Sequence, residues 1–147
     1  MIHFRFNDGT IDIPGEWEDK SVIALSYPSG KTESLANITI TRDFVKDKNI
    51  DLAEYVDKQL VNFAKSFSKF ELIKRKSIEI ANHQAIQIEF HWKTPDKIIV
   101  YQKQTILFHP NKPVILTITC TSQKSNIKKF EKQFNEILQT LKLITIN

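Results

Sequence analysis

Apolar and polar residues alternate along most of the chain, and this period of two is typical of strands, because successive side chains of a strand point to opposite faces. Asn7-Asp8-Gly9 predicts a tight turn with a residue of positive φ after the first strand, and Pro28-Ser29-Gly30-Lys31 predicts a turn after the third. The expected strands are His3–Phe6, Thr10–Ile13, Ser21–Tyr27, Leu35–Arg42, Phe70–Ile80, Gln84–Trp92, Ile98–Phe108 and Val114–Thr121.

Two other segments repeat apolar residues every three or four positions, which is the pattern of a helix with one face against a core. The first runs from Asp51 to about Ser66, where Asp51-Leu52-Ala53-Glu54 resembles a capping box, and the second from Ser125, its expected cap, to about Leu141. Gln59 falls on the apolar stripe of the first helix. Either it touches water at the edge of the stripe, or it faces a site and offers its amide to a ligand.

The stretch from Gln84 to Cys120 is apolar or amide-bearing on both faces, unlike a half-exposed antiparallel strand. Within it, alternate positions of Ile98–Phe108 include Gln102 on one face and Tyr101 and Leu107 on the other. One face must cover the core, and we interpret the other as a surface that a partner covers. Two helices can cover one face of such a sheet or part of each face. The threonine- and glutamine-rich remainder is then the candidate open face, which favours binding over catalysis.

Composition narrows the class of protein. At 147 residues, with 41% hydrophobic and 26% charged residues, the chain suits one globular domain spanning 1–147. The net charge of +4 is spread along the sequence, and its densest run, Lys74-Arg75-Lys76, is interpreted as solvated, so we expect no nucleic-acid partner. We expect no signal peptide and no stable membrane insertion, because no run approaches the roughly 18 apolar residues of a membrane span. A single cysteine suits a reducing, cytoplasmic location.

Residues that could carry chemistry are few and scattered. His3, His83, His91 and His109 have no metal-ligand spacing, and the three glycines of the chain cannot form a phosphate-binding loop. Cys120 alternates with threonines and is expected to be a structural thiol. We therefore expect no metal, nucleotide or other cofactor and no enzymatic activity. Trp17 is expected to close one end of the core, with an exposed binding tryptophan as the alternative.

The order of landmarks resembles a known family. Pro14, Trp17, Asp19 and Ser21 match the pattern P-x-x-W-x-D-x-S. The later landmarks are Asn37–Asp43, a helix with Leu52, Tyr55, Gln59 and Leu60, then Phe90-His91-Trp92-Lys93 and Tyr101-Gln102-Lys103-Gln104. Together these segments resemble the DcrB-related family, and within it the Eag-type chaperones, or adaptors, of bacterial type VI secretion. One departure is the turn Ala81-Asn82-His83, where glycine is expected.

The resemblance implies an α+β fold, a PsbP/Mog-like α/β sandwich with a twisted antiparallel sheet and two main helices. It also implies a cytoplasmic homodimer that binds the N-terminal transmembrane helices of an effector with a PAAR domain, shields them, assists loading and contacts the spike protein indirectly. The residues that correspond to the effector-helix binding face are Val22, Ala24, Thr39, Gln59, Phe63, Ile98 and Gln102. A DcrB- or PsbP-like accessory or scaffold module of another assembly is the alternative, and a small-molecule hydrolase or isomerase ranks last.

Overall fold

The computed structural model describes residues 1–28, 36–46 and 49–145. Leu35 and the turn expected at 28–31 beyond Pro28 therefore lie outside the described residues. The secondary structure follows the alternation closely. In chain order the elements are β1 (Ile2–Phe6), β2 (Gly9–Ile13), β3 (Ile23–Ser26), β4 (Asn37–Phe44), α1 (Leu52–Ser66), β5 (Glu71–Ile80), β6 (His83–Lys93), β7 (Ile99–Phe108), β8 (Val114–Gln123), the 3-10 turn η1 (Lys124–Asn126) and α2 (Ile127–Gln139).

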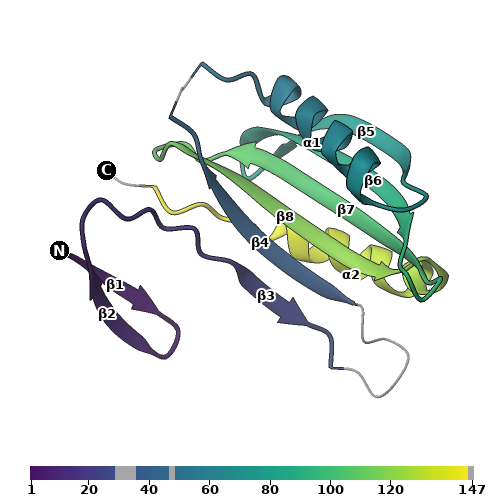
Figure 1. Cartoon of the computed structure of the whole chain (residues 1–147), viewed down its shortest axis with the longest axis horizontal. Coiled ribbons are helices and arrows are strands. Elements are labelled where there is room, and N and C mark those ends of the chain that lie inside the picture. Colours follow the sequence, from purple (N-terminus) through teal and green to yellow (C-terminus); the bar gives the residue numbers. More distant parts are fainter. Residues whose placement is uncertain (29–35, 47–48, 146–147) are drawn as a thin grey trace.

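Six of these strands form one antiparallel sheet in the order β3-β4-β8-β7-β6-β5, while β1 and β2 pair only with each other (Figure 1). Strands β5 to β8 are a meander joined by short turns, as the sequence predicts, and β4 adds to β8 at the other side. The two remaining edges of the sheet are β3 and β5.

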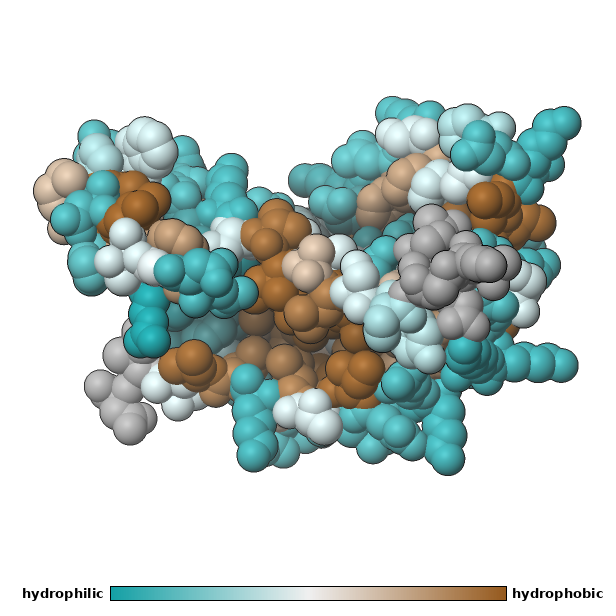
Figure 2. Space-filling model, turned by 90° about the horizontal axis from the view of Figure 1, so that it is seen from below, coloured by the Kyte–Doolittle hydropathy of each residue, from teal (hydrophilic) through white to brown (hydrophobic). Residues whose placement is uncertain are grey.

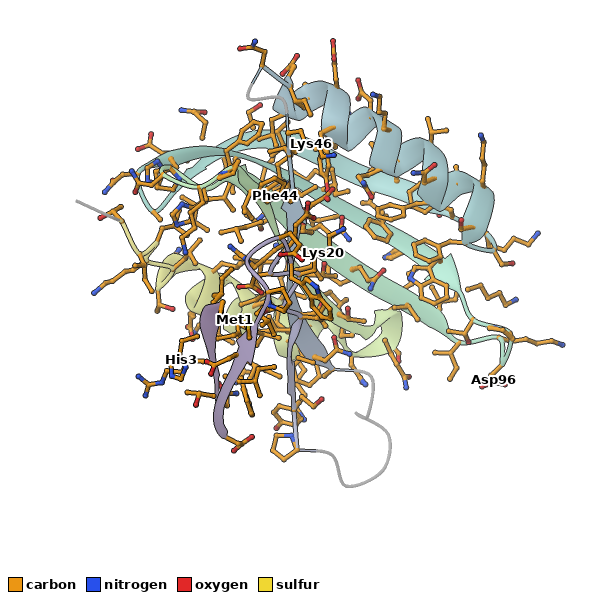
Figure 3. The ribbon with its side chains drawn as sticks, turned by 60° about the vertical axis from the view of Figure 1, so that its left-hand side comes forward. Met1, His3, Lys20, Phe44, Lys46 and Asp96 are labelled. Carbon is orange, nitrogen blue, oxygen red and sulfur yellow. The ribbon has the colours of Figure 1, made fainter. Side chains whose placement is uncertain are left out.

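The two helices lie on opposite faces of the sheet, as Figure 3 shows from the side. Helix α1 packs on β6 and β7 around Val56, Ile88 and Phe90. Helix α2 packs on the other face, with Phe130 and Phe134 against Cys120. Tyr101 and Leu107 face α2 and are 4% and 0% exposed within one chain. Our interpretation that a partner covers the second face of the central strand was therefore wrong, since a helix of the same chain covers it.

The start of α1 agrees with the cap predicted from the sequence, and the start of α2 does not. Asp51 is the N-cap of α1, and its carboxylate accepts a hydrogen bond from the Ala53 N–H at 3.1 Å. At α2 the predicted cap Ser125 was wrong, because it belongs to the 3-10 turn and Asn126, with no side-chain cap, precedes the helix.

The hairpin of β1 and β2 forms as predicted, but its turn differs from the prediction. Neither Gly9 nor Gly15 has a positive φ, and neither do Asn7 and Asp8. Glycine matters at position 9 for a different reason: a Cβ there would lie 3.2 Å from the Phe6 ring, which packs across the hairpin. Trp17, just beyond the hairpin, is 62% exposed and does not close the core, so that expectation was also wrong.

Candidate functional site on the uncovered face of the sheet

Part of the α1 side of the sheet is left bare, because α1 covers β6 and β7 and no described helix crosses β3, β4 and β8 on that side (Figure 1). We call this part the uncovered face. Two rows of directly paired residues cross it, one of them Ser26, Asn37, Thr121 and Gln102, the other Ala24, Thr39, Thr119 and Gln104. Neither row contains a charged residue, so this part of the face presents hydroxyls and amides, and the Asp43 carboxylate lies further along β4.

Gln102 stands where this polar face meets the apolar core beneath α1. Its Oε1 accepts a hydrogen bond from Trp92 Nε1 at 2.9 Å, and its Nε2 donates to Thr121 Oγ1 at 3.0 Å. Trp92 is half-buried and Thr121 is buried, so the amide links the aromatic residues of β6 to the threonines of β8 away from bulk water. Gln102 is thus a structural bridge as well as a member of the predicted site.

Helix α1 borders the uncovered face with one row of side chains. Tyr55, Gln59 and Phe63 are spaced four residues apart and therefore lie on one side of the helix. Tyr55 Oη donates to Asp43 Oδ2 on β4 at 2.9 Å, so this side of the helix is turned toward the uncovered strands. Burial and the Asp43 carboxylate raise the pKa of Tyr55, so its hydroxyl keeps its proton at neutral pH. Gln59, one turn further along, is half-buried, and no described side chain hydrogen-bonds its amide.

Phe63 connects the border to an aromatic cluster. Its ring lies 5.3 Å from Phe90 and 5.2 Å from Phe67, and Phe67 stacks on Trp92 at 4.7 Å. Since Phe90 is the direct neighbour of Gln102 across the strands, apolar rings and hydrogen-bonding amides lie side by side. A surface of this kind can hold an apolar segment and also satisfy its scattered polar groups.

The seven predicted site residues are not equally close together. Ala24 and Thr39 are direct partners, Gln102 lies in the next row, and Gln59 and Phe63 flank the face from α1. Val22 directly precedes β3 and is 65% exposed, whereas Ile98 lies in the turn before β7, at the opposite end of the sheet. The prediction also omitted Asn37, Gln104, Thr119 and Thr121, although their alternation with apolar residues in the sequence was a signal that could have identified them.

The opposite face holds buried ionisable groups of the described residues. The Lys103 ammonium donates to Asn135 Oδ1 at 2.9 Å, and the Tyr101 hydroxyl donates to Glu89 at 2.5 Å. Cys120 is 0% exposed, and burial raises the pKa of its thiol to about 11, so it is protonated and inaccessible in the folded chain. Among the described residues, no three His, Cys, Asp or Glu side chains gather in a way that could hold a metal ion. Neither described helix has the length and apolar content needed to cross a membrane.

The P-x-x-W-x-D-x-S segment, which connects the hairpin to the sheet, is fixed by its aspartate. Asp19 accepts hydrogen bonds from the Ser21 N–H and hydroxyl. Its carboxylate also pairs with Arg42 of β4 at 2.8 Å. Partial burial acts to raise the pKa of Asp19, but the Ser21 hydrogen bonds and the Arg42 charge outweigh it and lower that pKa. This segment is therefore attached to β4, and the hairpin extends beyond the attachment.

Comparison with known proteins identifies the family. A family model described as DcrB matches residues 8–140. The chain belongs to the DcrB family. Within this similarity, the DcrB-family chain is 26% identical over 141 residues to Effector EagT6 of Pseudomonas aeruginosa, which covers 96% of the chain and 95% of EagT6. The resemblance predicted from the landmarks is confirmed.

Solved structures place this DcrB-family chain in the predicted fold class. The P. aeruginosa protein PA94, of unknown function, matches with a TM-score of 0.82 and 25% identity over 99% of both chains. The PsbP protein CyanoP of Synechocystis matches with a TM-score of 0.57 and 9% identity, covering 84% of this chain and 82% of CyanoP. LpqN of Mycobacterium tuberculosis matches with a TM-score of 0.54 and 10% identity, covering 88% of each chain. The latter two show the fold alone, and they confirm the α+β, PsbP-like sandwich.

Proposed function

We propose that this chain is a type VI secretion chaperone, an adaptor that binds and shields the N-terminal transmembrane helices of an effector with a PAAR domain. In this proposal the chain acts in the cytoplasm as a homodimer of single-domain subunits, without a cofactor or enzymatic activity. It releases the effector's helices as the effector is loaded on the secretion spike, which it contacts only indirectly. The similarity to EagT6 over nearly the whole chain supports this proposal.

The observation that carries the proposal is the pair of uncharged rows on the uncovered face, beside the aromatic cluster. An apolar helix can be held there without burying an ion, which would be costly against an apolar surface. The occasional serine, threonine or backbone carbonyl of a transmembrane helix would otherwise lose its hydrogen bonds on leaving water, and the threonines of β4 and β8 can replace them. Val22 and Phe63, at two borders of the face, add apolar contact area.

Co-expression with the tagged N-terminal region of a candidate effector, followed by co-purification, tests the proposal. Ala24→Lys is the informative variant, because Ala24 is exposed on β3 and the substitution places an ammonium on the uncovered face without disturbing the core. We expect wild type to co-purify with the effector region and Ala24→Lys to lose it.

Ala64→Lys is the matched control. Ala64 is exposed on α1 outside the Tyr55–Gln59–Phe63 row, so the same change there should leave binding intact. Equal capture by wild type and Ala24→Lys would show that helices are not held on this face. Failure of wild type to capture any effector region that carries transmembrane helices would favour the accessory or scaffold module instead.

A further inference from the structure

The uncovered face carries a carboxylate at one of its ends. Asp43 follows Thr39 and Thr41 on this side of β4 and pairs with Ile115 near the start of β8. Its Oδ2 accepts a hydrogen bond from Tyr55 Oη at 2.9 Å, which fixes the carboxylate at the border with α1. Asp43 is exposed and forms no ion pair with another described residue, so its negative charge is not neutralised locally.

The other charged residues at this end are balanced in sign. Two ion pairs, Arg42–Asp19 and Lys20–Glu18, neutralise their own charges. The remaining groups are two carboxylates at the start of α1 and two ammonium groups in the bends after β4 and β7, from Asp51, Glu54, Lys46 and Lys112. The Asp43 carboxylate is therefore the charge that distinguishes this end of the face.

Lysines gather at the opposite end of the sheet. Lys97 lies in the turn between β6 and β7, Lys124 directly follows β8, and both line one open recess. Both side chains are exposed, and neither ammonium has an ion-pair partner within the described parts of the chain. Figure 3 shows Asp96, the neighbour of Lys97, far from Phe44 at the end of β4. Further charged residues near this end are Lys65, Lys69, Lys93 and Glu71. Lysines therefore outnumber carboxylates here, and the end is basic.

A transmembrane helix is long enough to reach both ends of the face. From Asn37 to Asp43, β4 rises about 20 Å, whereas a helix of about 20 residues is about 30 Å long. Helix α1, which borders the face, runs along the strands (Figure 1), so a second helix beside it takes the same direction or the reverse. One end of that helix then lies at Asp43 and the other at Lys97 and Lys124.

The charges at the two ends distinguish the two directions. A helix carries partial positive charge at its N-terminus and partial negative charge at its C-terminus, and opposite charges within about one turn stabilise each end. An N-terminus at Asp43 and a C-terminus at Lys97 and Lys124 meet opposite charges, whereas the reverse direction meets like charges at both ends. Helix α1 begins at the Asp43 end, so its own dipole favours the reverse direction. The Asp51 cap and Lys65 in the last turn of α1 offset that dipole.

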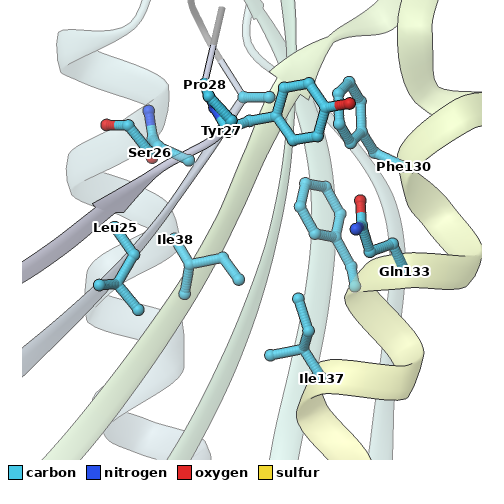
Figure 4. A pocket seen from close by; sticks show the side chains of 11 residues that line it. Leu25, Ser26, Tyr27, Pro28, Ile38, Phe130, Gln133 and Ile137 are labelled. Atoms are coloured by element: carbon cyan, nitrogen blue, oxygen red, sulfur yellow. The ribbon is translucent and has the colours of Figure 1, made fainter.

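The apolar groove between β3 and α2, on the other side of the sheet, is a poorer place for such a helix. The side chains of Leu25, Ile38 and Ile137 point toward one another across this groove (Figure 4). Seen from below, apolar side chains gather beside the same recess (Figure 2). The groove encloses about 380 Å³. A helix that is about 10 Å across and 30 Å long occupies roughly 2,000 Å³, so the groove can take only a few side chains.

We infer that the uncovered face holds an apolar helix in one direction, with the N-terminal end of the helix at Asp43 and the C-terminal end at Lys97 and Lys124. This inference rests on the proposed function, because it concerns the same face and the same effector helices, and it adds their direction. Charged side chains next to the bound helix follow the same rule. Basic residues before the helix are attracted to Asp43, and acidic residues after it are attracted to the lysines.

Disulfide cross-linking of a captured effector region measures this direction. Val22→Cys marks the Asp43 end of the face, where Val22 directly precedes β3 and is 65% exposed. Ser125→Cys marks the basic end, because Ser125 is exposed and lines the recess there. The effector region, with its own cysteines replaced by serine, carries one cysteine directly before or directly after a transmembrane helix. Cys120 is 0% exposed and does not compete.

We expect the cysteine before the helix to link to the Val22→Cys protein and the cysteine after it to link to the Ser125→Cys protein. Leu25→Cys is the matched control, because Leu25 is 58% exposed on the groove side of β3, and it should link to neither effector cysteine. The reverse pattern, or equal yields at both ends, overturns the inference. A captured effector region that links to neither marked end also overturns it.

Neutralising either end tests the cause of the direction. Asp43→Asn removes the charge but keeps an oxygen that accepts the Tyr55 hydrogen bond, and the double change Lys97→Gln, Lys124→Gln removes both lysine charges. Each should lower the ratio of expected to reverse cross-links about two- to fivefold. Lys58→Gln, at an exposed position of α1, is the control and should leave the ratio unchanged. Equal ratios in all of these proteins would overturn the inference.

The cross-linking results can be separated from those of the effector assay. A protein that captures the effector region but gives the reverse or a mixed pattern refutes the direction alone and leaves the proposed function standing. A wild type that captures no effector region refutes the proposed function, and the direction with it. Circular dichroism of each variant confirms that it is folded before cross-linking.

Discussion

Gln59 and Gln102 have the same side chain and similar apolar neighbours in sequence, yet the structure gives them different roles. Gln102 bridges Trp92 and Thr121, whereas no described side chain hydrogen-bonds Gln59. The difference arises across strands and could not be predicted from either residue's own neighbours. We therefore expect Gln102 to contribute to the stability of the free protein and Gln59 to contribute little to it.

We expect Gln102→Leu to lower the free energy of unfolding by about 1–3 kcal/mol, because it leaves the Trp92 N–H and the Thr121 hydroxyl without their partner. Gln59→Leu, the same change at the α1 border, should stay within about 0.5 kcal/mol of wild type. Urea unfolding of the free protein measures both. Equal stabilities of the two variants would contradict the bridging role of Gln102.

Ala81 illustrates backbone strain at a single residue. The turn between β5 and β6 places Ala81 and Asn82 at φ values of 52° and 63°, the left-handed region that two-residue hairpins use. Asparagine tolerates this region and glycine adopts it freely, but alanine has a Cβ that opposes it. The glycine that the family pattern led us to expect would relieve this strain.

Ala81→Gly should therefore raise the free energy of unfolding by roughly 0.5–1 kcal/mol, after the greater freedom of glycine in the unfolded chain is subtracted. Chemical denaturation provides the measurement. A loss of stability would show that the alanine methyl makes a favourable contact that outweighs its backbone strain.

At the scale of elements, the helices form from their apolar stripes, but their ends depend on local contacts. Asp51 caps α1 through the Ala53 N–H, while α2 begins after a 3-10 turn that holds the predicted cap. A capping residue must have an extended backbone and a side chain directed at the first turn, and Ser125 is inside a turn of its own.

The observed starts of α1 and α2 predict that Asp51→Ala lowers the stability of the protein and that Ser125→Ala leaves it nearly unchanged. Asp51→Ala should cost about 1 kcal/mol of stability, the usual value of an N-cap hydrogen bond. Ser125→Ala should change stability by less than about 0.5 kcal/mol, because it caps no helix. Thermal unfolding compares them directly. A larger loss at Ser125 than at Asp51 would contradict the observed helix starts.

The whole molecule couples its stability to pH through two kinds of group. Burial, together with the Lys124 charge, lowers the pKa of His91 below its ordinary value of 6.5, although Glu71 and Glu89 act in the opposite direction. The unfolded chain then binds a proton at His91 more readily than the folded chain does. Stability from neutral His91 is present above about pH 6.5 and is lost as the pH falls through that value. The lowered pKa of Asp19 adds stability above about pH 3.8 that is lost in stronger acid.

We therefore expect the free energy of unfolding to decrease between pH 7.5 and 5.5, measured by urea titration at each pH. His91→Gln, which removes the titrating ring but keeps a polar side chain, should make this decrease smaller. The result that would contradict the expectation is a His91→Gln protein with the same pH dependence as wild type.

Periodicity in the sequence determined the strands and both helices, because a side chain's preference for water or for the interior is set by its own chemistry. The fold class followed from the resemblance to the DcrB-related family. Periodicity also placed Thr39 and Gln102 on a polar, uncharged face. Sequence alone could not determine which face of the sheet each helix covers, because α1 and α2 have apolar stripes that fit either one.

Only the tertiary structure shows which face of the sheet each helix covers. This placement changed our interpretation of β7, the central strand. Tyr101 and Leu107 are covered by α2, and exposed apolar side chains lie instead on the hairpin, at Phe6 and Ile11. A short alternating segment has the same pattern whether it packs on its own chain or projects from it. The difference lies in the connecting segment, where Asp19 meets Arg42 across 23 residues of sequence.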